Sequence, residues 1–243
     1  MTRIALVVSD VDGTLLTKDK VLTEGAKAAV QKLHEAGIGF TIVSSRPTIG
    51  MGFLIEPLSI TLPIGAFNGS SIVDSKLRPI EQHLIPPAVA QRSLDVLNAF
   101  GVDIWLFTND RWYTRNRDGE YVPHEKLAIK ADPALLQRCE DAMHDAVGTE
   151  ATAVRSQTFY LDITPPGHDK GTFVEAMARR LGIATSAIAT IGDMENDLPM
   201  FAKSGRSFAM GNAADEIKRH ATHVTDTNED EGFAKAVEMI LAG

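Results

Sequence analysis

Four short runs of apolar residues, separated by longer stretches with helical periodicity, constrain the fold of this 243-residue chain more than any other feature. The runs are RIALVV, IGFTIV, LPIGAF and AIATIG, at residues 3–8, 38–43, 62–67 and 187–192. Apolarity that is continuous rather than alternating is typical of strands covered on both faces, as in a parallel sheet. The alternation of such strands with helices predicts a doubly wound α/β sheet.

Amphipathic helical patterns lie between and after these runs. The first begins after Thr23, a good N-cap residue, and ends at Gly37. The second ends at Gly182, and another lies near the end of the chain. In each pattern apolar residues recur at the spacing of a helix with one buried face. These stripes are Ala26, Ala29, Val30 and Leu33; Val174, Met177, Ala178 and Leu181; and Phe233, Val237 and Ile240.

The middle of the chain departs from this alternation. Residues 71–84 predict a hairpin, and Pro86–Pro87 predicts the start of a helix that ends near Phe100. The segments that follow are VDIWLF and RWYTR around a turn at residues 108–110, then KLAIKA, a helix through Cys139, and TFYLDI. We therefore predict an inserted α+β domain at residues 85–166, within a Rossmann-like core formed by residues 1–84 and 167–243.

Composition is that of an ordinary globular protein and disfavours several classes of partner. Apolar residues make up 44% of the chain, and no apolar run approaches the roughly 20 residues that span a bilayer. The formal net charge of −8 disfavours nucleic acid, because phosphate backbones attract basic surfaces. The single cysteine excludes an internal disulfide, and the N-terminus does not have the pattern of a signal peptide, so we expect a cytoplasmic protein. From the charge and the lack of a long apolar run, we expect no nucleic-acid or membrane partner. The sequence leaves open whether the protein is a monomer or a dimer.

Polar residues follow each apolar run, at the point where each predicted strand ends. In an open α/β sheet, ligands bind in the crevice at the carboxyl ends of the strands. If the four strands are parallel neighbours, their polar residues share one crevice. These residues are Asp10 and Asp12 after the first run; Ser44, Ser45 and Arg46 after the second; Asn68 and Gly69 after the third; and Asp193, Asn196 and Asp197 after the fourth.

The acidic residues in this set predict a cation site. Asp10 and Asp12 repel each other unless a positive charge lies between them, and Asp193 is expected at the same sheet edge. A site with oxygen ligands alone favours Mg²⁺, which also binds phosphate oxygens. Lys170 adds a cation just before a predicted helix, whose free N–H groups attract anions. Carboxylates, a metal, a lysine, a hydroxyl and a helix start together are typical of a phosphoryl-transfer site.

A calcium-binding loop is the simplest alternative for the two aspartate clusters. An EF-hand loop needs glycine at its sixth position. Counted from Asp10 that position is Leu15, and counted from Asp193 it is Leu198, so neither segment fits.

Other residues of the set also have structural explanations. Arg46 is as consistent with a structural ion pair as with a substrate contact, and Asn68 and Gly69 could form a turn. Asp197 is expected to brace its neighbours rather than to touch the metal. Thr14 can form hydrogen bonds within the loop that follows the first strand.

The chain resembles the haloacid dehalogenase-like superfamily and, within it, the Cof-type sugar-phosphatase branch. Six segments carry the resemblance, in family order and over the whole chain, with the insert between the second and third signature motifs. They are DVDGTLL, IVSSRP, FNGS, HDKGTFV, GDMENDLPM and AMGNAADEIK. The family more often has threonine-glycine where this chain has Ser44–Ser45.

The resemblance implies a role for each matching residue. Asp10 would be the nucleophile that forms an aspartyl-phosphate, and Asp12 would be the acid/base. Lys170 would screen the charges of the nucleophile and the phosphate. The phosphoryl oxygens would be contacted by Ser44, Ser45 and the backbone N–H of Val11, with Asn196 orienting nearby groups. The implied ligands of Mg²⁺ are Asp10, the backbone carbonyl of Asp12, and Asp193.

The implied activity is Mg²⁺-dependent hydrolysis of small phosphorylated metabolites, with sugar phosphates favoured. The insert would act as a C2-type cap domain that covers the crevice and selects the leaving group. Arg111, Tyr113, Arg115 and His124 are candidates for that selection. Two other functions stay open: a phosphomutase that uses the same residues on hexose phosphates, and a phospho-receiver or binding module in which the phosphoaspartate persists.

Overall fold

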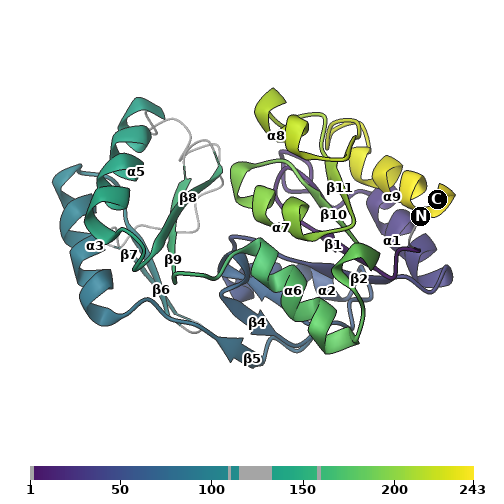
Figure 1. The fold of residues 1–243 in the computed structure, drawn as a ribbon, viewed down its shortest axis with the longest axis horizontal. Helices are drawn as coiled ribbons and strands as arrows, with labels where there is room; N and C mark the ends of the chain where they lie inside the picture. The colour runs from purple at the N-terminus through teal and green to yellow at the C-terminus, as the bar shows by residue number, and fades with distance from the viewer. Residues whose placement is uncertain (1–2, 109–110, 115–132, 158–159) are drawn as a thin grey trace. The chain divides into compact units, whose positions relative to one another are not determined.

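The computed structural model describes residues 3–108, 111–114, 133–157 and 160–243. The chain divides into two compact units (Figure 1). The first contains Met1–Gln82 and His168–Gly243, and the second contains His83–Gly167. Of the sequence expectations, the turn at residues 109–110, the KLAIKA segment, Arg115 and His124 lie outside the described residues. No helix in the described ranges is both long and apolar enough to span a bilayer.

A five-stranded parallel sheet forms the centre of the first unit, in the order β12-β11-β10-β1-β2 (Figure 1). Strand β1 lies between β10 and β2: it pairs with β10 through Ser9 and Ile191, and with β2 through Ser9 and Ile42. The parallel α/β sheet predicted from the sequence is therefore confirmed. The strands are β1 (Leu6–Ser9), β2 (Gly39–Ile42), β10 (Ile188–Gly192), β11 (Arg206–Ala209) and β12 (His223–Val224).

The third apolar run differs from its predicted place. It forms β3 (Ile64–Ala66), which pairs with β4 (Ser71–Val73) and, through it, with β5 (Pro79–Gln82) in a separate antiparallel sheet. It meets the chain that follows β2 at a parallel bridge between Val43 and Gly65, where the Ser44 N–H donates to the Gly65 carbonyl at 2.9 Å. Proline has no N–H to donate, so Pro63 cannot extend a ladder toward β2. Its carbonyl instead accepts a hydrogen bond from the hydroxyl of Thr41, 2.5 Å away.

Helices cover both faces of the parallel sheet, as the continuous apolarity of its strands predicts. Val7 packs on one side with α1 (Glu24–Glu35) and α9 (Gly232–Ala242). Its neighbours Leu6 and Val8 pack on the other side, where α6, α7 and α8 lie. Those helices are α6 (Lys170–Leu181), α7 (Leu198–Lys203) and α8 (Asp215–His220). The first unit also contains shorter helical elements: η1 (Thr48–Met51), α2 (Gly52–Ile55), η2 (Phe67–Gly69), η3 (Thr185–Ala187) and η4 (Glu195–Asp197).

The predicted helix signals match the structure closely. Thr23 caps α1 by accepting a hydrogen bond from the Ala26 N–H, and the predicted stripe of α1 is buried. Gly182 ends α6 in the left-handed conformation. Leu181 was expected in the buried stripe of α6 but is 39% exposed, because it is the last helical residue and the chain turns away at Gly182.

The second unit is of the α+β type. Its helices α3 (Pro87–Ala99) and α5 (Pro133–Val147) pack together around Val89 and Met143. Cys139 is buried in α5. Two antiparallel pairs accompany the helices: β6 (Trp105–Thr108) with β7 (Arg111–Thr114), and β8 (Thr152–Gln157) with β9 (Tyr160–Thr164).

Candidate active site

The ends of two neighbouring strands bring the predicted acidic residues together. Asp10 follows β1 and Asp193 follows β10, and these strands are parallel and hydrogen-bonded to each other. The backbone N–H of Asp10 extends the ladder by donating to the carbonyl of Ile191 at 2.9 Å. Two carboxylates that are 183 positions apart in sequence therefore lie at one sheet edge.

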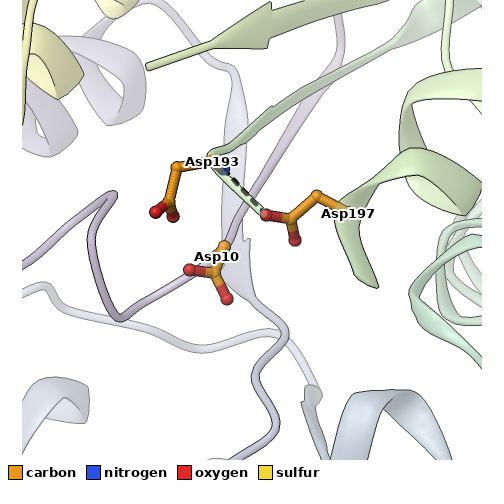
Figure 2. A group of neighbouring side chains, drawn as sticks. All are labelled: Asp10, Asp193 and Asp197. Atoms are coloured by element: carbon orange, nitrogen blue, oxygen red, sulfur yellow. Dashed lines mark hydrogen bonds between the residues drawn. The ribbon is translucent and has the colours of Figure 1, made fainter. Parts of the chain in front are cut away.

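Asp10, Asp193 and Asp197 form a buried carboxylate cluster (Figure 2). Each offers an oxygen within 4.8 Å of the others. Asp197 differs from its partners because its Oδ2 accepts the backbone N–H groups of Asp193 and Met194, at 2.8 and 2.9 Å. The carboxylates of Asp10 and Asp193 thus accept fewer hydrogen bonds from the protein than that of Asp197, which braces the loop after β10.

Lys170 is the cation of this cluster. It is 1% exposed, and its Nζ lies 2.5 Å from Asp10 Oδ1 and 2.6 Å from Asp197 Oδ1. Burial alone would lower its pKa, but the charges of Asp10 and Asp197 outweigh burial and raise the pKa well above its ordinary value. The ammonium is therefore charged at any pH at which the protein is used.

Lys170 is the first residue of α6 rather than a residue before it, which corrects the sequence expectation. The preceding Asp169 caps the helix: its carboxylate accepts from the N–H of Thr172 at 2.8 Å, and its own N–H donates to the Thr172 hydroxyl at 3.0 Å. Two of the N–H groups at the helix start, where an anion was expected, are thus already used. The helix start positions the lysine instead.

The charges of the cluster leave a deficit of positive charge. Burial raises the pKa of Asp10 to about 7, against the opposing effect of Lys170. Burial, followed by the charges of Asp10 and Asp197, raises the pKa of Asp193 well above its ordinary range. Three carboxylates against one ammonium leave an excess of two negative charges when all are ionised. A divalent cation held by carboxylate oxygens fits this excess, and Mg²⁺ prefers such ligands.

Two polar groups that the sequence did not single out for this purpose orient Asp193. The hydroxyl of Thr14 donates to its Oδ1 at 2.8 Å, so Thr14 reaches across the site rather than bonding within its own loop. The Asn212 amide donates to Asp193 Oδ2 at 3.2 Å and to the Gly13 carbonyl at 2.9 Å. Asn212 stands in the AMGNAADEIK segment, which was noted for its family resemblance but not for a role.

Asp12 lies in a different electrostatic environment. Arg46 binds it with two hydrogen bonds, from Nε to Oδ2 at 2.6 Å and from Nη2 to Oδ1 at 2.8 Å, and Lys20 Nζ lies 2.7 Å from Oδ1. Burial would raise the pKa of Asp12, but the hydrogen bonds and charges of Arg46 and Lys20 lower it below the ordinary range. Arg46 is therefore an ion-pair partner of Asp12, and Lys20 is a second partner that the sequence did not reveal.

The remaining predicted residues form a chain of contacts beside the carboxylates. The Asn196 amide donates to Asn68 Oδ1 at 2.9 Å, and the Asn68 N–H donates to the Ser44 carbonyl at 2.9 Å. All three residues are buried. Ser45 is partly buried beside them.

Two backbone positions complete the predicted set. Gly69 has φ +93°, and a Cβ there would lie 2.8 Å from the Asp169 carbonyl. Val11 is buried, and its carbonyl accepts the N–H groups of Leu15 and Leu16. The first compact unit therefore contains every residue predicted for catalysis, phosphate contact or metal binding.

The sequence profile of the haloacid dehalogenase-like hydrolases matches residues 7–127 and 120–237. The chain belongs to the haloacid dehalogenase-like hydrolase family. The expectation drawn from the six sequence segments is thereby confirmed.

Relatives of this hydrolase align over nearly their whole length. The 5-amino-6-(5-phospho-D-ribitylamino)uracil phosphatase YwtE of Bacillus subtilis is 27% identical, over 98% of this chain and 98% of that protein. An HMP-PP phosphatase of Cronobacter sakazakii is 25% identical, over 88% of this chain and 87% of that protein. The structure of the phosphatase BT1666 from Bacteroides thetaiotaomicron has a TM-score of 0.81 and 24% identity, over 99% and 96% of the two chains. This last likeness shows that the fold is shared.

Proposed function

We propose that this hydrolase is a Mg²⁺-dependent phosphatase that forms an aspartyl-phosphate on Asp10. The enzyme is a phosphatase by its family and by the activities of its relatives; the metal and the covalent intermediate are the proposed part. The observation that carries the proposal is the state of the Asp10 carboxylate. Lys170 binds its Oδ1, and no residue in the described ranges donates a hydrogen bond to its Oδ2.

Asp10 and Asp193, with the backbone carbonyl of Asp12, would hold the Mg²⁺ ion. When bound, this ion would supply positive charge that offsets the charge on the phosphoryl oxygens. Lys170 would screen the repulsion between the Asp10 carboxylate and the approaching phosphate dianion, because its ammonium is fixed by Asp10 and Asp197.

In the first chemical step, Asp10 attacks phosphorus and the bond from phosphorus to the leaving oxygen breaks. Asp12 gives its proton to that leaving oxygen, so the product departs as an alcohol. In the second step a water molecule attacks the phosphoaspartate, Asp12 takes the proton of the water, and Asp10 is released with inorganic phosphate. An acid/base group of this kind contributes about 10²- to 10⁴-fold in rate.

Arg46 and Lys20, the two ionic partners of Asp12, affect the protonation state that Asp12 needs in each step. The ionised carboxylate is the form that the second step requires, and Arg46 and Lys20 favour it. The first step requires the protonated form, so the bound substrate must weaken at least one of these contacts. Hydrogen bonds of catalytic groups commonly rearrange between the free enzyme and the substrate complex.

The substrate is proposed to be a small phosphorylated metabolite, with sugar phosphates favoured. Its phosphoryl oxygens would be held by Ser44, Ser45, Asn196 and the Val11 N–H, with Asn68 and Gly69 shaping the same strand end. Two relatives act on different small phosphates, which supports the class and leaves the individual compound open. The second unit, residues 83–167, is proposed to contribute to the choice of the leaving group.

The deciding experiment compares Asp10→Asn with Asp19→Asn, an exposed control in the same segment. We expect Asp10→Asn to abolish phosphate release while the far-ultraviolet circular dichroism is unchanged, and Asp19→Asn to behave as the wild type. Acid-quenched wild-type reactions should yield a phosphorylated peptide that contains Asp10, and a chelator should stop turnover. Near-normal hydrolysis by Asp10→Asn would show that Asp10 is not the nucleophile.

The products separate hydrolysis from phosphoryl transfer within a sugar. With hexose phosphates, a phosphatase releases inorganic phosphate, whereas a phosphomutase forms an isomeric sugar phosphate. We expect phosphate release with no isomer.

A further inference from the structure

Two cations contact the carboxylate of Asp12, although one would neutralise it. Arg46 alone engages both oxygens, with Nε 2.6 Å from Oδ2 and Nη2 2.8 Å from Oδ1. Lys20 is the second cation, and its Nζ lies 2.7 Å from Asp12 Oδ1. This group carries an excess of one positive charge, the opposite of the excess at Asp10, Asp193 and Asp197.

The two cations differ in how far the protein uses their donors. The remaining Nη1 of Arg46 donates to the Gly50 carbonyl at 3.0 Å, and the guanidinium lies over the ring of Phe53, 5.6 Å from its centroid. An ammonium has three N–H donors. Across the described part of the chain, Asp12 is the one residue that the Lys20 ammonium binds, and 25% of the Lys20 side chain is exposed. Lys20 therefore has donors available to a ligand.

The backbone holds Lys20 at Asp12 rather than leaving it as an ordinary surface lysine. Its N–H donates to the Thr17 carbonyl at 2.9 Å, and the N–H of Thr17 donates to the Val21 carbonyl at 3.1 Å. Lys20 has φ +61° in this turn, a conformation that is uncommon for residues other than glycine. Residues in such conformations are often found where function requires a side chain at a fixed place.

We propose that Lys20 is a specificity residue that favours substrates whose leaving group carries its own negative charge, as a carboxylate or a second phosphate. This inference rests on the proposed function, in which Asp12 protonates the leaving oxygen. The leaving group then lies beside Asp12, and therefore beside Lys20. An anionic group at that place meets an ammonium with unused donors, whereas a neutral hydroxyl gains much less from it.

The test uses two substrates of the same length: 3-phosphoglycerate, which has a carboxylate, and glycerol 3-phosphate, which has a hydroxymethyl group in its place. We expect the wild type to favour 3-phosphoglycerate at least about threefold in kcat/KM, the size expected of one partly exposed charge contact. Lys20→Gln should bring the ratio near one by raising KM for 3-phosphoglycerate. Lys20→Arg should retain the preference, and Lys18→Gln, an exposed neighbouring lysine, should leave it unchanged. Added salt should reduce the wild-type ratio.

The outcomes separate this inference from the proposed function. A wild-type ratio near one, or an equal loss on both substrates in Lys20→Gln, would overturn the specificity role and leave the phosphatase intact. If the wild type hydrolyses neither compound, the proposed function fails for this substrate class, and calorimetric titration of the same two compounds with Mg²⁺ present measures their binding directly. Equal affinity of the wild type for both compounds would then refute the role of Lys20.

Discussion

Gly13 lies in the loop after β1, against the carboxylate of Asp193, which is proposed to bind Mg²⁺. It has φ +84°, and a Cβ there would lie 2.4 Å from Asp193 Oδ2. That oxygen cannot move aside freely, because Thr14 and Asn212 hold the carboxylate from both sides. Gly37 offers a matched comparison, since it has φ +72° and a Cβ there would meet nothing within 4 Å.

Gly13→Ala and Gly37→Ala should therefore differ in function more than in stability. Both place a side chain in the left-handed region, which costs about 1–2 kcal/mol and lowers the urea midpoint. Gly13→Ala should in addition displace Asp193 and weaken Mg²⁺ affinity by about 10- to 100-fold, as disturbed metal supports commonly do. Phosphate release titrated against Mg²⁺ measures this effect. Equal Mg²⁺ dependence in the two variants would show that the contact with Asp193 is unimportant.

At the residue scale, the sequence placed Asp10 and Asp193 at the sheet edge where the structure has them, but it did not identify the hydrogen-bond partners of Asp193. Asp10, Asp12 and Asp193 were found because each follows an apolar run, and that signal is local. Thr14 and Asp193 are 179 positions apart, and Asn212 and Gly13 are 199 apart. Side chains such as Thr14, Asn212 and Lys20 have no local pattern that marks their distant partners, so their contacts required the structure.

Helix α6 shows how an element positions a side chain that is proposed to act in catalysis. Its capping box, in which Asp169 and Thr172 bind each other's backbone N–H groups, fixes the first turn and therefore the start of the Lys170 side chain. Helix α1 has a comparable cap in Thr23, which lies at its N-terminus and has no contact with the carboxylate cluster in the structure.

Asp169→Ala and Thr23→Ala should thus separate stability from catalysis. Loss of either cap should cost about 1 kcal/mol of unfolding free energy, because a helix N–H loses its acceptor. Asp169→Ala should also lower kcat at least about tenfold, since a catalytic ammonium displaced by a fraction of an ångström screens the phosphate less well. Urea unfolding and phosphate release measure the two effects. If Thr23→Ala lowered kcat as much, the loss would be a general effect of destabilisation.

At the element scale, features that depend on neighbouring residues could be predicted, whereas features that depend on residues distant in sequence could not. The Thr23 cap and buried stripe of α1 and the ending of α6 at Gly182 depend on residues within a few turns, and they were predicted, whereas the Asp169 cap of α6 was not. The partner of β3 depends on which strand it meets in space: it pairs with β4 and meets the chain after β2 at Val43. Periodicity identifies a strand but does not state its neighbour.

For the whole molecule, the acidic cluster is expected to couple stability to pH and, if it binds Mg²⁺ as proposed, to that ion. The pKa of Asp10 is about 7 in the folded protein and 3.8 as its ordinary value, so between these limits the folded state binds more protons than the unfolded state. Stability from Asp10 is therefore greatest below about pH 4 and is lost as pH rises toward 7. The raised pKa of Asp193 acts in the same direction. Asp12 has a lowered pKa, and its contribution is lost only as pH falls below its ordinary value.

Mg²⁺ should reverse this loss, because it binds the ionised carboxylates of the folded state alone. With a chelator present, the free energy of unfolding should fall between about pH 5 and about pH 7.5, and the rise in melting temperature on adding Mg²⁺ should be larger at the higher pH. Differential scanning calorimetry at both pH values measures this directly. Asp193→Asn should show a smaller fall with pH and little response to Mg²⁺, since one repelling charge and one ligand are both removed. A Mg²⁺-induced shift that is the same at both pH values in the wild type would mean that the ion does not compete with protons at these carboxylates, and therefore that it binds elsewhere.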